Sequence, residues 1–595
     1  MKTIKNLVTG NEFISIPELN TGTGSIKDIT LLHYRSKGLL DLRGDDDGLF
    51  NISISVDDVL IDNQKIEWSL VNYWIPRGIY EDNIIKIELT ILAPLGHKGF
   101  VYNVVQTNKS LKDVTIKVRF WGRLKGLYHC VNEEMFFDGK YEKLKSTWND
   151  SFYYSISQGF PCLSFAPIVD SEFISSDSSV DGLSYSFECE SILNKESCKS
   201  VNAYWGFGYE QVSAITAARE MERWGIVALN NETNKYLVDK KIVTMSSEFD
   251  ELLNRNLFFN IFYSTGKTID TEQRVMVTSR SPKYYVSASY WDRDGLLWAF
   301  PSIAKVDPEL AKEMLMYVAT VQAKNVGIHS RYIDGSVLEP GFELDELCAP
   351  ILAIDNYLTL NNDVSLLKDH YIDKLIQKII KTLELKRSDK LGLYETFLQP
   401  TDDMNVYPYL TYNNVLVWKV YKILESFNFN GTKGLWANKA ENVKSAIYKN
   451  CIKTIDDRDL FIWSVDEDNH YDIYDEPPGS LILLSTLGFC DNEDEIYKNS
   501  VQTILSEDYK YSFSDKPFGA IGCEHAKHPW ILSLANLFRV QKSEDTLQKL
   551  LKAQMDDGLA CESIDEYSGV STTGDAFATC AGYLSYSLMV GKNIF

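Results

Sequence analysis

The chain has 595 residues and lacks any long hydrophobic run. Its start, MKTIKNLVTGNEFISIPELN, has no apolar core of the length that a signal peptide needs. No later stretch approaches the length of a membrane-spanning helix. These absences argue against secretion and against a membrane-embedded protein, so we expect a cytoplasmic protein without a membrane partner.

The cysteines also lack the spacings that mark disulfide frameworks. The 10 cysteines include no CxxC pair and are scattered along the chain, several among apolar or small residues. They are expected to be buried free thiols of a reducing compartment. Nothing in the sequence requires a cofactor, and we expect neither a cofactor nor a metal.

The sequence contains fewer basic than acidic residues. There are 60 Lys and Arg against 83 Asp and Glu, for a formal net charge of −23, and such a field repels polyanions. This excludes nucleic acid as an expected partner and favours uncharged substrates. Aromatic residues, at 12%, are plentiful. Sugars stack on aromatic rings, so this content fits a carbohydrate enzyme, although core packing uses most of the rings.

The length is too great for one hydrophobic core, and the hydrophobic period changes near residue 210. Alternating runs at 50–56, 86–93 and 114–121 have the period of β-strands and predict an antiparallel β-sandwich over residues 1–208. Residues 209–283 are expected to form a helical linker. Apolar helices alternate with polar loops over 284–595, which predicts an (α/α)6 barrel as the catalytic domain. Two of the expected helices span 364–383 and 526–537.

Two acidic segments carry the chemistry. Glu562 lies between small residues in the segment LACESIDE, where a water or substrate has room beside it, as a general base requires. The plain alternative is a solvated loop acid. Asp402 and Asp403 are adjacent in QPTDDMNVYPYL, and their mutual repulsion can keep one of them protonated, as a general acid requires. Paired carboxylates with aromatic platforms are typical of glycoside hydrolysis.

Further loops offer groups that can bind sugar hydroxyls. In YWDRDGLLW, Trp291 can hold a sugar ring while Arg293 and Asp294 bond its hydroxyls, although Asp292 or Asp294 can equally cap a helix. In FELDEL, three acids stand among core residues, where burial is costly without partners. The pair His525 and His528 has the spacing of metal ligands, but hydroxyl recognition or structural capping is preferred because no other ligand cluster accompanies it.

The order of these motifs resembles that of glycoside hydrolase family 125, the metal-independent exo-acting α-mannosidases. The motifs are YWDRDGLLW, FELDELCAPI, QPTDDMNVYPYLTYNNVL, DEPPGSLILLSTLGF, IYKNSVQTILS, GAIGCEHAKHPWILSL and CESIDE. The resemblance implies an (α/α)6 barrel and an inverting mechanism. It also implies that Asp403, or its neighbour Asp402, is the acid and that Glu562 is the base.

The first 208 residues depart from that family, whose members largely lack a large N-terminal β-domain. A β-domain ahead of such a barrel is similar to that of bacterial glucoamylases and disaccharide phosphorylases, which leaves the identity of the sugar open. A glucoamylase-like arrangement would recruit Glu395, in LGLYETF, as the acid.

The sequence therefore predicts an inverting exo-glycosidase that hydrolyses terminal α-linked sugars of an oligosaccharide or glycoside, with α-mannosides favoured. The alternatives are a glucoamylase-type α-glucosidase, a disaccharide phosphorylase and a non-catalytic carbohydrate-binding protein. The residues expected to bind the sugar are Trp291, Asp292, Arg293, Asp294, Glu343, Asp345, Glu346, Tyr407, Asn413, Glu476, His525 and His528.

Overall fold

The structure, a computed structural model, describes residues 4–146, 152–157, 162–171, 174–176, 184–244, 246–432 and 434–593. The chain divides into two compact units. The first, here called the β unit, comprises Met1–Val243, Thr265–Val275 and Ser279–Ala288. The second, the helical unit, comprises Thr244–Ser264, Met276–Thr278 and Ser289–Phe595.

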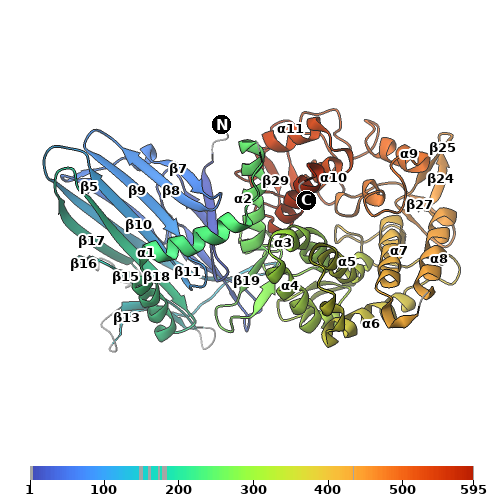
Figure 1. Cartoon of the computed structure of the whole chain (residues 1–595), viewed down its shortest axis with the longest axis horizontal. Helices are drawn as coiled ribbons and strands as arrows, with labels where there is room; N and C mark the ends of the chain where they lie inside the picture. Colours follow the sequence, from blue (N-terminus) through green and yellow to red (C-terminus); the bar gives the residue numbers. More distant parts are fainter. Residues whose placement is uncertain are drawn as a thin grey trace. The chain divides into compact units, whose positions relative to one another are not determined.

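The β unit contains two antiparallel sheets, coloured blue to green in Figure 1. The first consists of β1 (Asn6–Gly10), β2 (Ile14–Asn20), β3 (Asp28–His33), β4 (Gly38–Gly44), β5 (Asn51–Val56), β6 (Val59–Leu60), β11 (Val114–Cys130), β12 (Glu134–Phe136), β16 (Ile174–Ser176) and β17 (Ser184–Leu193). The second consists of β7 (Glu67–Val71), β8 (Ile75–Glu81), β9 (Ile85–Leu92), β10 (Gly99–Asn108), β13 (Lys140–Lys145), β14 (Phe152–Ser157), β15 (Cys162–Val169) and β18 (Cys198–Gly208).

The two sheets share one hydrophobic core. Strand β11 buries alternate residues at its start, as its sequence pattern predicts. Phe50, which adjoins β5 of the first sheet, has its ring centroid 4.7 Å from that of Trp205 and 5.0 Å from that of Phe100, both in the second sheet. Full burial of one such ring contributes about 1.5–3 kcal/mol. The interior of this unit is thus largely aromatic and aliphatic.

A long helix, α1 (Gln211–Lys240), packs on β15 and β18. It bends at Gly225, whose φ of 73° is a left-handed conformation that glycine adopts without steric cost. The bend lets the two halves of α1 take different directions along the β unit.

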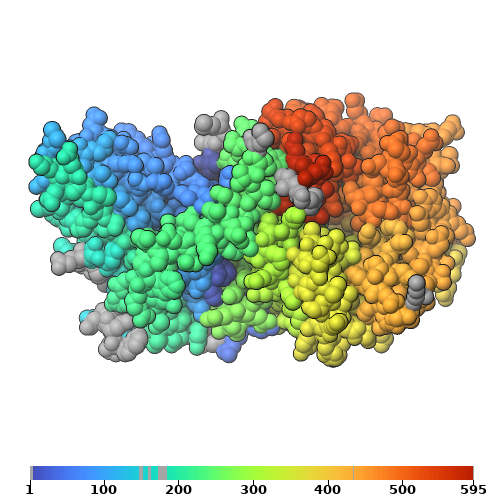
Figure 2. All heavy atoms as spheres, in the orientation of Figure 1, coloured from blue at the N-terminus to red at the C-terminus, as the bar shows by residue number. Residues whose placement is uncertain are grey.

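In the helical unit, one set of elements forms a closed ring of contacts in which each packs on the next and the last packs on the first. In ring order these are η2 (Arg293–Ala299) continuing into α3 (Phe300–Val306), α5 (Leu344–Asn361), α7 (Thr411–Ser426), η7 (Leu481–Leu484), α10 (Ile531–Gln541) and α12 (Ala578–Gly591). In Figure 2 the yellow-green residues near position 300 lie beside the red C-terminal part, as the contact of α3 with α12 requires.

A second set of helices packs against the ring elements: α2 on α12, α4 on α3 and α5, α6 on α4 and α5, α8 on α7, α9 on η7, and α11 on α10. Figure 1 shows these helices following one another around the unit. Their bounds are α2 (Ser247–Tyr263), α4 (Pro308–Thr320), α6 (His370–Leu385), α8 (Leu435–Asn450), α9 (Glu495–Ile504) and α11 (Glu544–Lys552).

The helix boundaries follow from capping and proline. The expected helix at 364–383 is divided into a 3-10 turn, η4 (Val364–Lys368), and α6, because the Asp369 side chain accepts from the backbone N–H groups of Tyr371 and Ile372. Helix α6 then buries Ile372, Leu375, Ile376, Ile379 and Leu383, the stripe of an amphipathic helix. The expected helix at 526–537 begins only at Ile531, because Pro529 disfavours helix at the residue before it.

Short elements fill the connections. They are η1 (Asn63–Lys65), β19 (Thr265–Lys267), β20 (Arg274–Met276), η3 (Gln322–Asn325), β21 (Ile328–Arg331), β22 (Val337–Phe342), β23 (Tyr409–Leu410), η5 (Phe429–Gly431), β24 (Ile452–Ile455), β25 (Arg458–Phe461), β26 (Ser464–Val465), β27 (Tyr471–Asp472), η6 (Pro477–Gly479), β28 (Ser563–Ile564) and β29 (Ser571–Thr573). Within the described residues, no helix combines the length and the apolar character that a membrane crossing demands.

Candidate active site

Charged side chains gather at the N-terminal ends of the ring elements. They are Arg293 at the start of η2, Glu343 before α5, Asp402 and Asp403 before α7, Glu476 before η6 and η7, His525 before α10 and Glu562 before α12. The unsatisfied N–H groups at a helix N-terminus carry partial positive charge, which stabilises nearby carboxylates. The sequence positions span some 270 residues, yet the contacts below connect most of them.

Arg293 is the centre of one cluster and is almost fully buried. Its Nη1 donates to Glu343 Oε2 at 2.6 Å and to Asp345 Oδ2 at 3.1 Å, and its Nη2 donates to Asp402 Oδ1 at 2.5 Å. Burial alone would lower the pKa of Arg293, but the carboxylates of Asp402 and Glu343 raise it well above its ordinary value. The guanidinium therefore stays charged and holds three acids in fixed positions.

A second buried pair supports the first. Arg331 Nη2 donates to Asp292 Oδ2 at 2.5 Å, and the Tyr290 hydroxyl donates to Asp292 Oδ1 at 2.6 Å. Glu346 accepts from the backbone N–H groups of Asp292 and Arg293, the latter at 2.9 Å. Asp292 makes no side-chain cap of η2. The acids of FELDEL thus find partners for their burial inside the protein.

Asp294 lies on the other side of Arg293. Its Oδ1 accepts from the Thr579 hydroxyl at 3.0 Å, at the start of α12, and its Oδ2 is 3.7 Å from Arg293 Nε. Burial raises the pKa of Asp294 to about 7, although Arg293 opposes the shift. This carboxyl therefore connects η2 with its neighbour α12, where the ring of contacts closes.

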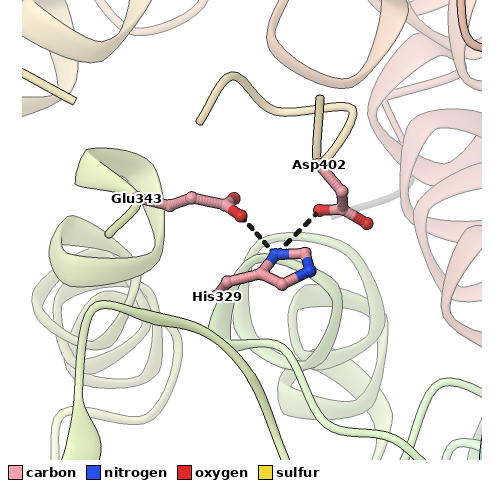
Figure 3. Close-up of side chains that lie close together, drawn as sticks. All are labelled: His329, Glu343 and Asp402. Atoms are coloured by element: carbon pink, nitrogen blue, oxygen red, sulfur yellow. Dashed lines mark hydrogen bonds and ion pairs between the residues drawn. The ribbon is translucent and has the colours of Figure 1, made fainter. Parts of the chain in front are cut away.

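His329 lies between Glu343 and Asp402, with both carboxylates directed at its Nδ1 (Figure 3). The distances from Nδ1 are 2.5 Å to Glu343 Oε1 and 3.6 Å to Asp402 Oδ1. Trp291 is buried, and its indole nitrogen is 3.3 Å from the same Nδ1. Burial lowers the pKa of His329, but the hydrogen bond to Glu343 and the charge of Asp402 outweigh it, so the net pKa is raised.

Three of these atoms, from His329, Glu343 and Asp402, are close enough together to hold a cation. However, Glu343 and Asp402 already bind the charged guanidinium of Arg293. A metal ion at this position would be repelled by the charge of Arg293. The donor set fits an ion-pair network better than a metal site.

His525 lies between the two acids for which the sequence predicts catalytic roles. Its Nδ1 is 3.2 Å from Asp403 Oδ2, and its Nε2 is 3.6 Å from Glu562 Oε1. Because the two ring nitrogens of an imidazole are about 2 Å apart, these carboxylate oxygens are at most about 9 Å apart. The hydrogen bond to Asp403, followed by the charge of Glu562, raises the pKa of His525 to about 9.

Glu476 is buried next to this group. Its Oε1 accepts from Gln399 Nε2 at 2.7 Å, and its Oε2 accepts from the Thr401 hydroxyl at 2.5 Å. Burial, reinforced by the charge of Asp403, raises the pKa of Glu476 to about 8, although the Thr401 hydrogen bond opposes the shift. At neutral pH Glu476 is therefore largely protonated, in contrast to a solvated glutamate.

Glu562 is fixed by its main chain. It precedes the hairpin of β28 and β29, its N–H donates to the carbonyls of Thr573 and Gly574 at 3.2 Å, and its carbonyl accepts from the N–H of Ile531 at 3.1 Å. Gly574 has a φ of 62°, and a Cβ there would lie 2.5 Å from Glu562 Cβ. Glycine is thus needed at 574 both for the backbone and for space beside the Glu562 side chain.

Four of the predicted residues lie outside these contacts. Glu395 pairs with Lys386 at 3.1 Å, and the ring of Tyr407 stacks on that of His470 at 6.3 Å. His528 Nδ1 is 2.8 Å from Glu566 Oε2, and with Asp565 these form a second, half-buried group of possible metal ligands. Asn413 is fully buried, and its side-chain amide makes no hydrogen bond within the described residues.

Four residues of the site were not predicted from the sequence: His329, Arg331, Gln399 and Thr401. His329 and Arg331 alternate on β21 and are both buried. Two buried basic residues at spacing i, i+2, just ahead of the acidic FELDEL segment, are the signal that would have indicated them. Gln399 and Thr401 flank Pro400, within the motif that supplied Asp402 and Asp403.

Comparisons with known proteins agree with this arrangement. Residues 386–589 match the family described as metal-independent alpha-mannosidase (GH125), which confirms the resemblance for that part of the chain. The match spans Asp402, Asp403, Glu476, His525 and Glu562. No curated protein matches the chain.

Solved structures resemble the chain at low sequence identity. A bacterial glucoamylase in complex with acarbose has a TM-score of 0.67 at 12% identity and covers 99% of this chain and 94% of its own. Another similar structure is a metal-independent alpha mannosidase from Streptococcus pneumoniae, in a non-productive complex with alpha-1,6-mannobiose. It has a TM-score of 0.51 at 16% identity and covers 58% of this chain and 95% of its own. A protein provisionally assigned as a kojibiose phosphorylase, from the human microbiome, has a TM-score of 0.58 at 12% identity and covers 99% and 90%.

These identities establish the fold alone: antiparallel sheets followed by a helical part, as in glucoamylase. The family match over residues 386–589 adds chemistry, and it supports glycosidase activity for this chain.

Proposed function

We propose that this protein is an inverting exo-glycosidase that removes terminal α-linked sugars, with α-mannosides as its favoured substrates. Asp403 acts as the general acid and Glu562 as the general base. Trp291, Arg293, Asp294 and His525 belong to the wall that receives the terminal sugar. The family match supports α-mannosides as substrates, and the geometry around His525 supports the roles of Asp403 and Glu562 as acid and base.

The observation that carries the proposal is that one imidazole separates Asp403 from Glu562. Inverting glycosidases hold their two carboxyl groups roughly 6.5 to 9.5 Å apart, so that a water fits beside the base, whereas retaining enzymes hold them about 5 to 5.5 Å apart. The upper limit of about 9 Å set by the His525 contacts admits the inverting separation but sets no lower limit, so the configuration of the first-formed product decides between the two mechanisms. Asp402 is the less suitable acid because Arg293 binds it directly.

The reaction then proceeds in one displacement. Glu562 takes a proton from a water whose oxygen attacks the anomeric carbon, and Asp403 gives a proton to the glycosidic oxygen as the bond to that carbon breaks. In the free site this proton is held by His525, whose pKa is raised to about 9, and it passes to Asp403 through their 3.2 Å hydrogen bond before Asp403 gives it to the glycosidic oxygen. The anomeric configuration inverts, so an α-linked substrate yields a β-sugar.

The same proposal specifies the fold more finely. The ring elements and the helices that pack against them correspond to the inner and outer helices of an (α/α)6 barrel, and the two sheets with their common core correspond to a β-sandwich. The site then lies where the loops before the inner helices meet.

A glucoamylase-type α-glucosidase is the second candidate, because the glucoamylase structure covers 99% of this chain, including the β unit, against 58% for the mannosidase. The sugar is the point on which the two candidates differ. The contacts of Glu395 do not favour it as the acid of such an enzyme, since it pairs with Lys386 and not with Asp403 or Glu562.

The test uses purified full-length protein with α-mannobioses, maltose, isomaltose and the matching aryl glycosides. We expect hydrolysis of α-mannosides and, by proton NMR of the first-formed product, release of the β-anomer. Initial release of the α-anomer would overturn the inverting mechanism. Hydrolysis of maltose in place of mannobiose would replace the mannosidase by the glucosidase, and cleavage that requires inorganic phosphate would assign a phosphorylase.

A further inference from the structure

The ring of contacts in the helical unit surrounds a cavity of about 270 Å³. Every ring element contributes to its lining: Trp298 from η2, Leu352 from α5, Leu416 from α7, Leu483 from η7, Leu532 from α10 and Tyr583 from α12. None of the carboxylates of the candidate active site lines it. The volume is near the lower end of small-molecule pockets, which start at about 300 Å³. The cavity is therefore of a size that fits a ligand about as large as a monosaccharide.

Two cations and a single acid line this cavity. Neither Arg539, near the end of α10, nor Lys419, on α7, lies within 4.0 Å of a carboxylate in the described part of the chain. The cavity lining includes one acid, Asp355, which interacts electrostatically with Lys419. The lining therefore has a formal excess of positive charge, in a chain whose net charge is −23.

Arg539 is held by aromatic rings. Its guanidinium carbon is 5.2 Å from the ring centroid of Tyr586 and 6.0 Å from that of Tyr583, and both rings also line the cavity. Cation–π contacts fix the plane of a guanidinium but neutralise none of its charge. A guanidinium fork binds the oxygens of a phosphate or a carboxylate in a bidentate manner, and partial burial strengthens that bond.

We propose that this cavity is a binding site for a small organic oxyanion, a phosphate or carboxylate on a body of monosaccharide size. Arg539 and Lys419 bind the oxyanion, and the body packs against Trp298, Tyr583 and the leucines of the wall. The site is separate from the proposed catalytic groups and does not depend on their roles.

The test is calorimetric titration of the full chain with glucose 6-phosphate, glucuronate and neutral glucose, with inorganic phosphate as a fourth probe. We expect at least one of the two charged sugars to bind at least ten-fold more tightly than glucose. Lys419→Met should weaken that binding by about 10- to 100-fold, as for loss of a charge-assisted bond. The matched control is Lys422→Met, which removes an exposed lysine one turn along the same helix and should leave the affinity unchanged.

A second variant, Arg539→Met, tests the partly buried cation, with thermal unfolding to verify its fold. Because Lys419 is only partly buried, its variant remains informative even where Arg539→Met fails to fold. Equal affinity for charged and neutral sugars would overturn the proposal. So would undiminished affinity for the charged probe in both Lys419→Met and a folded Arg539→Met, since the anion would then bind elsewhere. If inorganic phosphate binds as tightly as glucose 6-phosphate, the sugar adds nothing to the affinity, and the organic part of the proposed ligand would be rejected.

Discussion

The two ends of the ring elements in the helical unit differ in which charge is in excess. At their N-terminal ends, carboxylates predominate, as in Glu343, Asp402 and Glu562, while farther along the helices the cavity wall carries Lys419 and Arg539. This follows the helix dipole, which favours anions at the N-terminus and cations toward the C-terminus. The direction of the helices alone therefore distinguishes an end suited to acid and base chemistry from an interior suited to anions.

The ends also differ in how their charges are paired. At the N-terminal end, Arg293 and Arg331 have carboxylate partners at 2.5 to 3.1 Å, so their charges are paired within the protein. The cations of the cavity have no such partners in the described residues. Paired charges fix geometry, as catalysis requires, whereas cations without a close carboxylate partner indicate recognition of an external group.

The strongest test of the acidic end is Glu562→Gln. Turnover should fall by roughly two to four orders of magnitude, as for loss of general base catalysis, while thermal stability stays close to that of the wild type. Steady-state kinetics on a natural disaccharide measures this. The matched control is Glu566→Gln, in the same hairpin but paired with His528, which should keep its activity. Near-normal turnover of Glu562→Gln would contradict its role as base.

The next test separates the two adjacent aspartates. Asp403→Asn should lower turnover of a natural disaccharide by about 100-fold or more, and less with an aryl glycoside whose leaving group needs little protonation. Asp402→Asn should instead act mainly on stability, by about 1–3 kcal/mol, because it removes a charged acceptor from Arg293. Kinetics with both substrate types and chemical denaturation distinguish the two. The assignment fails if Asp402→Asn shows the dependence on leaving group and Asp403→Asn does not.

Gly574→Ala tests the space beside the base. The new Cβ would press on Glu562 and would also strain the left-handed backbone, so we expect about ten-fold lower turnover and a loss of about 1–2 kcal/mol of stability. Gly431→Ala is the control, since Gly431 has a similar φ of 65° but open space around it. It should lose stability but no activity. Equal turnover in the two variants would show that Gly574 serves the backbone alone.

A test that concerns stability alone uses Glu476 and pH. Because its pKa is raised in the folded state from 4.5 to about 8, its contribution to stability is full below about pH 4.5 and is lost as the pH rises toward 8. Glu476→Gln mimics the protonated form, so the stability of the variant should decline less than that of the wild type over this range. Thermal unfolding at several pH values measures the difference. Parallel pH profiles would show that Glu476 does not titrate in this window.

Much of this architecture was predictable, because it rests on local patterns. Period-two runs predicted strands such as β9 and β11, and the loop motifs predicted the acids that gather before the ring elements. The partners of those acids were not predictable. Asp292 bonds to Arg331, 39 residues away, and no local pattern distinguishes that pairing from a helix cap. The cavity is likewise a product of tertiary packing, since Lys419 and Arg539 come from helices far apart in sequence.

The backbone hydrogen bonds of residue 562 have a consequence for engineering. The N–H bonds to Thr573 and Gly574 and the carbonyl bond to Ile531 involve no atom of the glutamate side chain. These backbone bonds can therefore form whichever side chain residue 562 carries. Shortening Glu562 to Asp would withdraw the carboxylate by about the length of one C–C bond, on the order of 1.5 Å, while the backbone of the hairpin stays in place. Residue 562 thus offers a position at which the reach of a base can be varied independently of the scaffold that carries it.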